Sequence, residues 1–234
     1  PTTYDECLIS HKLKQSWIID IYTATDQGRS TAAALITGTA KAISDGSYKD
    51  GRGTSAATLS GDNFSLAIRT SNCVPGPPHQ QSAYRSELAG INMVLTHVMA
   101  LCEFYDIQDG AITLGLDGKQ AMLNCQQTHL DSSYPDFDML CDIQGKIKLI
   151  PITIIFKWIK GHQDSKRQVE FLDLWAQRNI LADHMAKSHM QTTTDLPYDT
   201  HLKYEGWSVL IDNYQLSCFN IKDMYRCIIK PEKD

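Results

Sequence analysis

The sequence predicts an α/β protein in which helices cover a mixed sheet. Two observations lead to this fold class. Three strand-like runs follow one another between residues 40 and 70, and beyond residue 84 strand-like runs alternate with helical segments. Strands joined by tight turns pair antiparallel, whereas a parallel pair needs a longer crossover connection, usually a helix. A meander followed by strands that alternate with helices therefore gives a sheet with both antiparallel and parallel pairs.

The meander is predicted from its turn residues. "KDGRG" separates the runs at 40–48 and 54–60, and "SGDN" precedes a third run, "FSLAIRT", which begins at residue 64. Asp-Gly and Gly-Asp between short runs of this kind are typical of hairpins. The segment 71–81, "SNCVPGPPHQQ", contains three prolines and is predicted to be a loop.

The second half is predicted to contain helices alternating with two strands. Apolar residues recur at helical spacing from Tyr84 to about Cys102, which predicts an amphipathic helix. "ITIIFKWIKGH" at 152–162 is rich in β-branched and aromatic residues, as strands are. The other predicted elements are a strand in "GAITLGLDG" and helices in "KQAMLNCQQ", "FDMLCDIQGKIKL" and residues 169–190.

Three regions are predicted along the chain. Residues 39–190 form the main domain, 1–38 an N-terminal extension and 191–234 a linker with a C-terminal extension. The N-terminal extension contains an apolar run, "SWIIDIY", and a small-residue stretch, "STAAALITGTA", that is predicted to be helical. Because the chain begins at a proline, we expect it to be a piece of a longer polypeptide.

Composition excludes some function classes. The 234 residues are 42% hydrophobic and 21% charged with a net charge of −5, so any basic surface for nucleic acid must be local. We find no apolar stretch of about 20 residues and no signal segment, and expect no membrane partner. The seven cysteines form no Cys-x-x-Cys pair, which indicates free thiols in a reducing compartment, the cytoplasm or nucleus.

Four acidic residues stand at positions that face the core or end a strand. Asp45 shares a strand face with Ile43, and Glu87 lies on the apolar stripe of its helix. Asp117 ends a buried strand, where α/β sheets place ligands, and Asp183 neighbours small residues on the last long helix. Each alone is more often a turn former or a solvated residue. Converging carboxylates repel strongly, however, and all-oxygen ligands suit Mg²⁺ or Mn²⁺.

The order of the motifs resembles the type 1 ribonuclease H family. The matching segments, which cover about residues 40–190, are "SDGSY", "YRSEL", "LGLDGKQ", "WIKGH" and "RNILADHMAK". The resemblance implies a ribonuclease H-like fold, a five-stranded mixed sheet in the order 3-2-1-4-5 with helices on both faces. The sequence around these motifs resembles domains of reverse-transcriptase retroelement polyproteins. A reverse transcriptase domain in the same polyprotein is therefore an expected partner.

The resemblance implies an endonuclease that cuts the RNA strand of RNA/DNA hybrids with two Mg²⁺ ions, for which Mn²⁺ is a substitute. Its metal ligands are then Asp45, Glu87, Asp117 and Asp183. Asp45 bridges both ions, Asp183 serves the ion that activates water, and the other two serve the ion at the leaving 3′ oxygen. His162 is the implied catalytic histidine that assists proton transfer or product departure.

Other residues are assigned to nucleic acid or to the core. Gly46 and Ser47 are predicted to let the substrate approach the backbone. Asn179 is predicted to orient groups at the site, and Trp158 is assigned to the core. The predicted nucleic-acid contacts are completed by Arg85, Lys119 and Lys160.

Two departures from the family leave the substrate open. Ala83 and Tyr84 stand where the family often has two asparagines, and Gly118 followed by Lys119 replaces a serine. Reading the 2′-hydroxyls of RNA depends on such positions. The alternatives are a non-catalytic ribonuclease H-like module of a reverse transcriptase that binds nucleic acid, and a transposase- or integrase-like nuclease acting on DNA.

Overall fold

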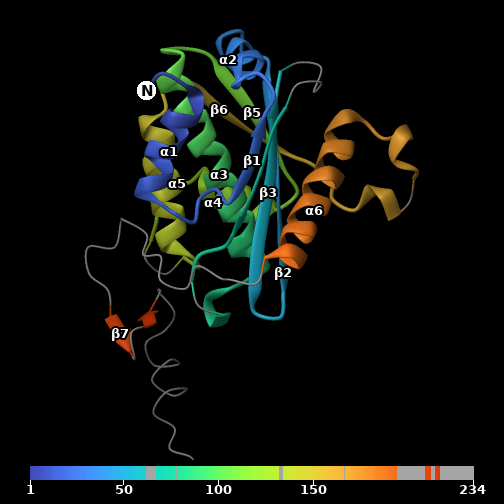
Figure 1. Ribbon diagram of the computed structural model, residues 1–234. Helices are drawn as coiled ribbons and strands as arrows, with labels where there is room; N and C mark the ends of the chain where they lie inside the picture. Colours follow the sequence, from blue (N-terminus) through green and yellow to red (C-terminus); the bar gives the residue numbers. More distant parts are fainter. Residues whose placement is uncertain are drawn as a thin grey trace, which may run out of the picture.

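Six strands form the central sheet of the computed structural model, which describes residues 1–61, 67–76, 78–131, 134–165, 167–193, 209–211 and 214–216 (Figure 1). In chain order these strands are β1 (Ile21–Ala24), β2 (Ala40–Lys49), β3 (Arg52–Ser60), β4 (Ala67–Cys73), β5 (Ala111–Leu116) and β6 (Thr153–Trp158). The helices are α1 (Tyr4–Lys14), α2 (Arg29–Ile36), α3 (Ala83–Phe104), α4 (Lys119–Cys125), α5 (Phe137–Leu149) and α6 (Leu174–Thr192).

The strand order is β1-β4-β3-β2-β5-β6. β2, β3 and β4 form the antiparallel meander, while β5 pairs in parallel with β2, and β6 with β5. The part β4-β3-β2-β5-β6 matches the predicted order 3-2-1-4-5, so the mixed sheet is confirmed. The prediction of five strands is wrong by one, because β1 pairs antiparallel with β4 at the edge of the meander.

β1 was missed because it is short. Its four residues include Ile, Tyr and Thr, which favour strands, but they are at the lower limit of the length over which an alternating pattern can be recognised. The burial lies just before it, where Trp17, Ile18 and Ile19 enter the core. The pairing of Ile21 with Ser71 of β4 defines the strand, and that pairing exists only in the folded chain.

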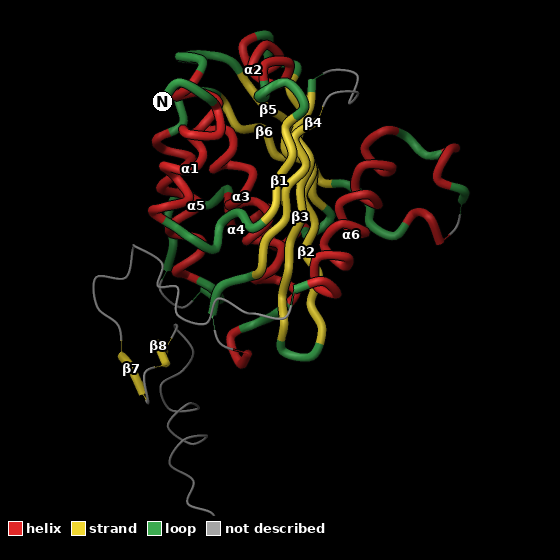
Figure 2. The backbone as a smooth tube through the Cα atoms, in the orientation of Figure 1, coloured by secondary structure: helices red, strands yellow, loops and turns green. Residues whose placement is uncertain are grey.

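Helices lie on both faces of the sheet (Figure 2). α3 packs against β2 and β3 on one face, with α1 and α5 stacked on its outer side. α6 packs against β2 and β3 on the other face. Ile43 of β2 and Ala182 of α6 belong to one small apolar cluster, which places the odd-numbered residues of this part of β2 on the α6 face.

α3 is the core helix of the molecule. Ser82 caps its N-terminus by accepting a hydrogen bond from the backbone N–H of Arg85 at 2.9 Å. By length and hydropathy alone α3 is apolar enough to cross a membrane, but 78% of that apolar window is buried inside the protein. Its hydrophobicity is therefore accounted for by the core.

The start of α6 differs from the predicted one. α6 begins at Leu174, where Asp173 accepts a hydrogen bond from the N–H of Ala176, and the predicted first turn, Val169–Phe171, is a separate 3-10 helix. Two further 3-10 turns are Pro78–Gln80 and Gln163–Ser165.

Both predicted extensions contain regular secondary structure. The N-terminal segment adds α1, β1 and α2, with Tyr4 and Trp17 in the core. At the C-terminus β7 (Val209–Ile211) pairs with β8 (Tyr214–Leu216). The predicted linker 191–200 begins within the last turn of α6, which ends at Thr192, and its residues 194–200 and the run "MYRCIIK" lie outside the described residues. The predicted domain limits stay predictions.

Candidate active site

Three of the four predicted acids meet at one end of the sheet. Asp45 lies within β2, Asp117 follows β5 directly, and Glu87 is the fifth residue of α3. Because β2 and β5 are parallel neighbours, residues towards their carboxyl ends lie close together. One carboxylate oxygen from each of the three residues lies within 4.8 Å of the others.

The close approach of α3 to β2 brings Glu87 to Asp45. A Cβ on Gly46 would lie 2.6 Å from the backbone nitrogen of Glu87 and 2.8 Å from the Cβ of Ser86, so only glycine fits between strand and helix. The N–H of Gly46 donates a hydrogen bond to Oε1 of Glu87 at 3.3 Å. Gly46 thus has a packing role, while the predicted nucleic-acid contacts of Gly46 and half-buried Ser47 stay predictions.

The electrostatics of this group favour protonation when no cation is bound. Burial, followed by the charges of Asp117 and Asp183, raises the pKa of Asp45 to about 8. Burial, followed by the charges of Asp45 and Asp117, raises the pKa of Glu87 well above its usual value. Oε2 of Glu87 is buried and has no hydrogen-bond partner among the residues that the structure describes. A divalent cation would satisfy that oxygen and relieve the repulsion, so the donor set fits Mg²⁺.

Asp183 lies outside this group of three oxygens. It projects from α6, and its Oδ2 accepts a hydrogen bond from Nζ of Lys187 at 2.7 Å, one helical turn away. Its negative charge nevertheless contributes to the raised pKa of Asp45, so it acts on the same site from the α6 face. The ion pair with Lys187 lowers the cost of holding a fourth carboxylate there.

Asp117 is held in place from three sides. Asn179 of α6 is 4% exposed and donates to Oδ2 of Asp117 at 3.2 Å, and its role in orienting groups for a reaction stays a prediction. A Cβ on Gly161 would lie 2.4 Å from that same oxygen, so the loop after β6 presses against the carboxylate. Nε1 of Trp158 donates to the backbone oxygen of Asp117 at 3.1 Å.

Trp158 and Gly161 are the residues whose place at the site was missed. Trp158 is 50% exposed, so its assignment to the core is wrong. It ends β6, an edge strand whose residues are exposed or half-buried along its whole length. The sequence signal for both residues was the segment "WIKGH", in which a glycine follows closely on a strand end.

Three further polar residues predicted to act at the site are exposed. His162 lies in the loop after β6 with a φ of 52°, a left-handed conformation uncommon outside glycine. Lys160 precedes it in the same loop, and Lys119 is the first residue of α4, two positions after Asp117. Their contacts with substrate stay predictions.

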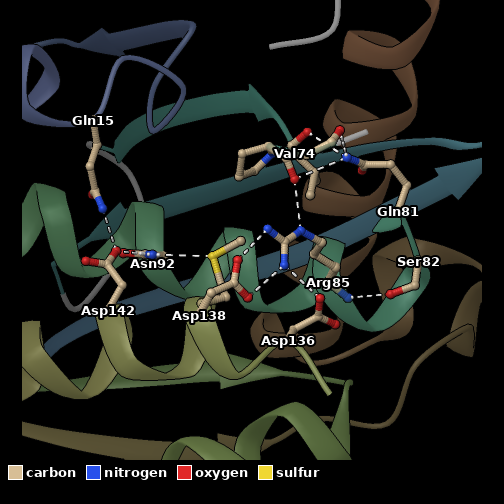
Figure 3. Close-up of polar contacts among 12 residues, drawn as sticks. Gln15, Val74, Gln81, Ser82, Arg85, Asn92, Asp136, Asp138 and Asp142 are labelled. Carbon is tan, nitrogen blue, oxygen red and sulfur yellow. Dashed lines mark hydrogen bonds and ion pairs between the residues drawn. The ribbon is translucent and has the colours of Figure 1, made fainter. Parts of the chain in front are cut away.

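Arg85 does not lie where a phosphate can reach it (Figure 3). The side chain is 2% exposed, and its guanidinium donates to Asp136 at 2.7 Å and to Asp138 at 2.9 and 3.0 Å. Its Nε donates to the carbonyl of Pro75 at 2.9 Å. The prediction that Arg85 binds nucleic acid is therefore wrong: two buried carboxylates require the cation inside the protein.

The departure at Tyr84 also has a structural explanation. The hydroxyl of Tyr84 accepts a hydrogen bond from Nδ2 of Asn124 at 2.6 Å, which ties the start of α3 to α4. Burial raises the pKa of this phenol to about 12, so it stays protonated at neutral pH. Ala83, the preceding residue, is exposed.

Comparison with known proteins gives structural similarities at low identity. No family model matches the chain, and no curated protein matches it. One similar structure is the N-terminal ribonuclease H domain of a Mycobacterium tuberculosis protein fused to maltose-binding protein: 14% identity, TM-score 0.45, covering 64% of this chain and 94% of that one.

Two other similar structures carry related names. Ribonuclease H1 of the archaeon Halobacterium salinarum has 12% identity and a TM-score of 0.43, covering 66% of this chain and 98% of its own. The LC11 ribonuclease H1, solved in complex with an RNA/DNA hybrid, has 10% identity and a TM-score of 0.46, covering 64% of this chain and 99% of its own. Neither activity nor substrate follows from similarities at these values.

Proposed function

We propose that this protein is a metal-dependent endonuclease that hydrolyses the RNA strand of RNA/DNA hybrids, as part of a retroelement polyprotein in a reducing compartment. The observation that carries the proposal is the convergence of Asp45, Glu87 and Asp117 within 4.8 Å, with one buried glutamate oxygen left without a partner in the described residues. The order of the five motifs supports the choice of reaction.

The residues around the site have distinct tasks in this mechanism. Asp45, Glu87 and Asp117 would hold the metal, and Asp183 would extend the ligand set from α6. Two Mg²⁺ ions would supply Lewis acidity and a hydroxide nucleophile near neutral pH. Asn179 fixes the orientation of the Asp117 carboxylate through its 3.2 Å hydrogen bond. His162, exposed on the adjoining loop, is assigned to carrying a proton between the site and solvent.

The raised pKa of Asp45 has a consequence for metal dependence. At neutral pH an uncharged Asp45 does not bind a cation well, so metal binding must displace its proton. Metal affinity should therefore increase as the pH rises towards about 8, the pKa of Asp45. The same burial that makes the free carboxylates costly strengthens their interaction with a bound cation.

The assay that tests the proposal compares Asp45→Asn with the parent on a labelled RNA/DNA hybrid in Mg²⁺. We expect the parent to cleave the RNA strand and Asp45→Asn to lose at least about 100-fold in rate, since each tenfold corresponds to about 1.4 kcal/mol of barrier. Asp106→Asn is the matched control. It lies beyond the far end of α3, roughly 28 Å of helix from Glu87, and should cleave like the parent.

Two outcomes would favour other functions. Tight hybrid binding without metal-dependent turnover in the parent would indicate a nucleic-acid-binding module. One observation favours this alternative. Tyr84 stands where the family often has an asparagine, and its hydroxyl is already hydrogen-bonded to Asn124. Cleavage of an all-DNA duplex as fast as the hybrid would indicate a DNA-strand nuclease, because such an enzyme needs no 2′-hydroxyl. Equal rates for Asp45→Asn and the parent would contradict the mechanism.

A further inference from the structure

A second group of metal-ligating side chains lies away from the carboxylates. Asp20 precedes β1, Cys73 ends β4 and His189 lies in the last turn of α6. One ligand atom from each of these residues lies within 4.8 Å of the others. The three residues are far apart in the sequence and come from three elements, so the group exists only in the folded chain.

The geometry of the group differs from that of a catalytic relay. The thiol of Cys73 lies 3.6 Å from Nε2 of His189, and Oδ2 of Asp20 lies 3.0 Å from that same nitrogen. In a nucleophile–histidine–carboxylate relay, thiol and carboxylate contact opposite nitrogens of the ring. One N–H on Nε2 of His189 cannot donate a good hydrogen bond to both the Cys73 sulfur and the Asp20 carboxylate. Sulfur, nitrogen and oxygen atoms instead lie within 4.8 Å of one another, a spacing that one metal ion can bridge.

We propose that Asp20, Cys73 and His189 form a binding site for a zinc-type divalent cation. The mixed sulfur, nitrogen and oxygen donors select Zn²⁺ over Mg²⁺. Thiolate and carboxylate charges together balance a divalent ion. The site is separate from the proposed nuclease centre and does not depend on it.

The distances fit zinc with a small adjustment. Around a tetrahedral ion with Zn–S about 2.3 Å and Zn–N about 2.0 Å, sulfur and nitrogen are about 3.5 Å apart. The separation between Cys73 and His189 is 3.6 Å. Nitrogen and oxygen ligands would be about 3.3 Å apart, so the pair formed by His189 and Asp20, at 3.0 Å, must open by about 0.3 Å.

The surroundings of His189 supply the outer partner that metal-bound histidines have. Its other ring nitrogen, Nδ1, lies 3.2 Å from Oγ of buried Ser71. Because a hydroxyl can either donate or accept, Ser71 can accept a hydrogen bond from Nδ1 in the tautomer whose Nε2 lone pair binds a metal. The backbone N–H of Cys73 donates to Oδ2 of Asp20 at 2.8 Å, which holds the carboxylate beside the thiol.

The burial of the ligands leaves one side of the site open. The side chain of His189 is 3% exposed and Cys73 is 2% exposed, whereas the Asp20 side chain is 32% exposed. An ion can enter beside Asp20, and a water molecule can complete four-coordination there. A bound ion would tie the end of α6, the helix that carries Asp183 and Asn179, to the edge of the sheet.

The site can be tested on the full chain with Co²⁺ and Zn²⁺ as probes, in excess Mg²⁺ to occupy the carboxylate site. A thiolate bound to Co²⁺ gives a charge-transfer absorption that carboxylates alone do not give, and Zn²⁺ should displace the Co²⁺ at one equivalent. Chelator competition then measures the Zn²⁺ affinity. We expect Cys73→Ser to lose the absorption band, and Cys102→Ser, which alters a buried thiol outside the group, to keep it.

A second variant keeps the test informative if Cys73→Ser does not fold. Asp20→Asn changes the most exposed ligand, and it should weaken Zn²⁺ binding by at least the roughly 10- to 100-fold that loss of an outer partner costs. Asp45→Asn should bind Zn²⁺ like the parent, so failure of the nuclease assay and failure of the zinc site are distinguishable.

Three results concerning the absorption band would overturn the proposal. The Co²⁺-loaded parent shows no thiolate band, the Cys73→Ser protein folds and keeps the band, or the Cys7→Ser protein loses it. The last result would move the ion to Cys7, His11 and Glu103, a more open group in which the Glu103 side chain is 51% exposed. If the Asp20→Asn protein binds Zn²⁺ as tightly as the parent, the three-residue site is also excluded.

Discussion

Asp45 and Glu87 illustrate how single residues link burial to chemistry. Both carboxyl groups have raised pKa values because they are buried and because each meets other acids. Their environment is therefore unfavourable for the metal-free ionised form and favourable for a cation. A residue that costs stability in the absence of its ligand is typical of a functional site rather than of a structural one.

Asp45 gives the stability of the metal-free protein a pH dependence. Its folded pKa of about 8 lies above the ordinary 3.8, so over that range the folded chain keeps a proton that the unfolded chain has lost. The free energy of unfolding therefore falls as pH rises. Buried His97, whose pKa is lowered from 6.5 to about 3, has the opposite effect below about 6.5.

As the pH rises from about 6.5 to 8, the free energy of unfolding of the metal-free parent should fall by up to about 2 kcal/mol more than that of Asp45→Asn. One bound proton corresponds to about 1.4 kcal/mol per pH unit. Urea unfolding at a series of pH values, with a chelator present, measures the difference. Asp106→Asn should follow the parent. Identical slopes for parent and Asp45→Asn would show that Asp45 is not protonated in this range.

At the scale of elements, the start of α3 determines where Glu87 lies. Arg85 joins this turn to Asp136 and Asp138 at the start of α5 and to the loop before α3 (Figure 3). The amide of Gln81 donates to three carbonyl groups of the same loop, at 2.7 to 3.2 Å. The first turn of α3 is thus fixed from both sides, two residues before Glu87.

Arg85→Met should destabilise the protein, because it leaves two buried carboxylates without their cation. Breaking a buried ion pair costs roughly 3 to 5 kcal/mol. For a chain of this size that lowers Tm by roughly 2 to 4 °C per kcal/mol, measured by calorimetry. The matched control is Arg29→Met, an exposed arginine at the start of α2, which should change Tm little. Similar losses in both variants would contradict the role assigned to Arg85.

At the scale of the whole molecule, the N-terminal segment is part of the core. The hydroxyl of Tyr4 lies 2.6 Å from Nδ1 of His97 in the middle of α3, and Trp17 is 2% exposed. α1 therefore covers the outer side of α3, while β1 extends the sheet beyond β4. Folding of the site depends on residues that belong to none of the five motifs.

Trp17→Ala tests this dependence. Removing a buried tryptophan side chain costs roughly 3 to 5 kcal/mol, and the loss should appear as a lower urea midpoint with an unchanged slope. Leu13→Ala, at a position that is 82% exposed on α1, is the control and should stay within about 0.5 kcal/mol of the parent. A Trp17→Ala protein as stable as the control would show that this segment contributes little to the core.

Local patterns predicted most of the elements and the positions of the acids. Turn residues marked the meander, and helical periodicity marked α3, which begins within one residue of the predicted start. Asp45, Glu87 and Asp117 were recognisable because a carboxylate on an apolar face or at the end of a buried strand departs from the local pattern. These signals depend on neighbours in the chain, and a sequence displays them directly.

Contacts between distant segments were decided only by the tertiary structure. Arg85 looked like a phosphate ligand and Trp158 like a core residue, because charge and size alone do not show what lies opposite a side chain. β1 and the group of Asp20, Cys73 and His189 likewise depend on segments separated by about 50 to 170 positions. The sequence by itself determined the mixed sheet and the acidic residues. The tertiary structure decided which of them meet, because pairing and burial depend on elements brought together only by folding.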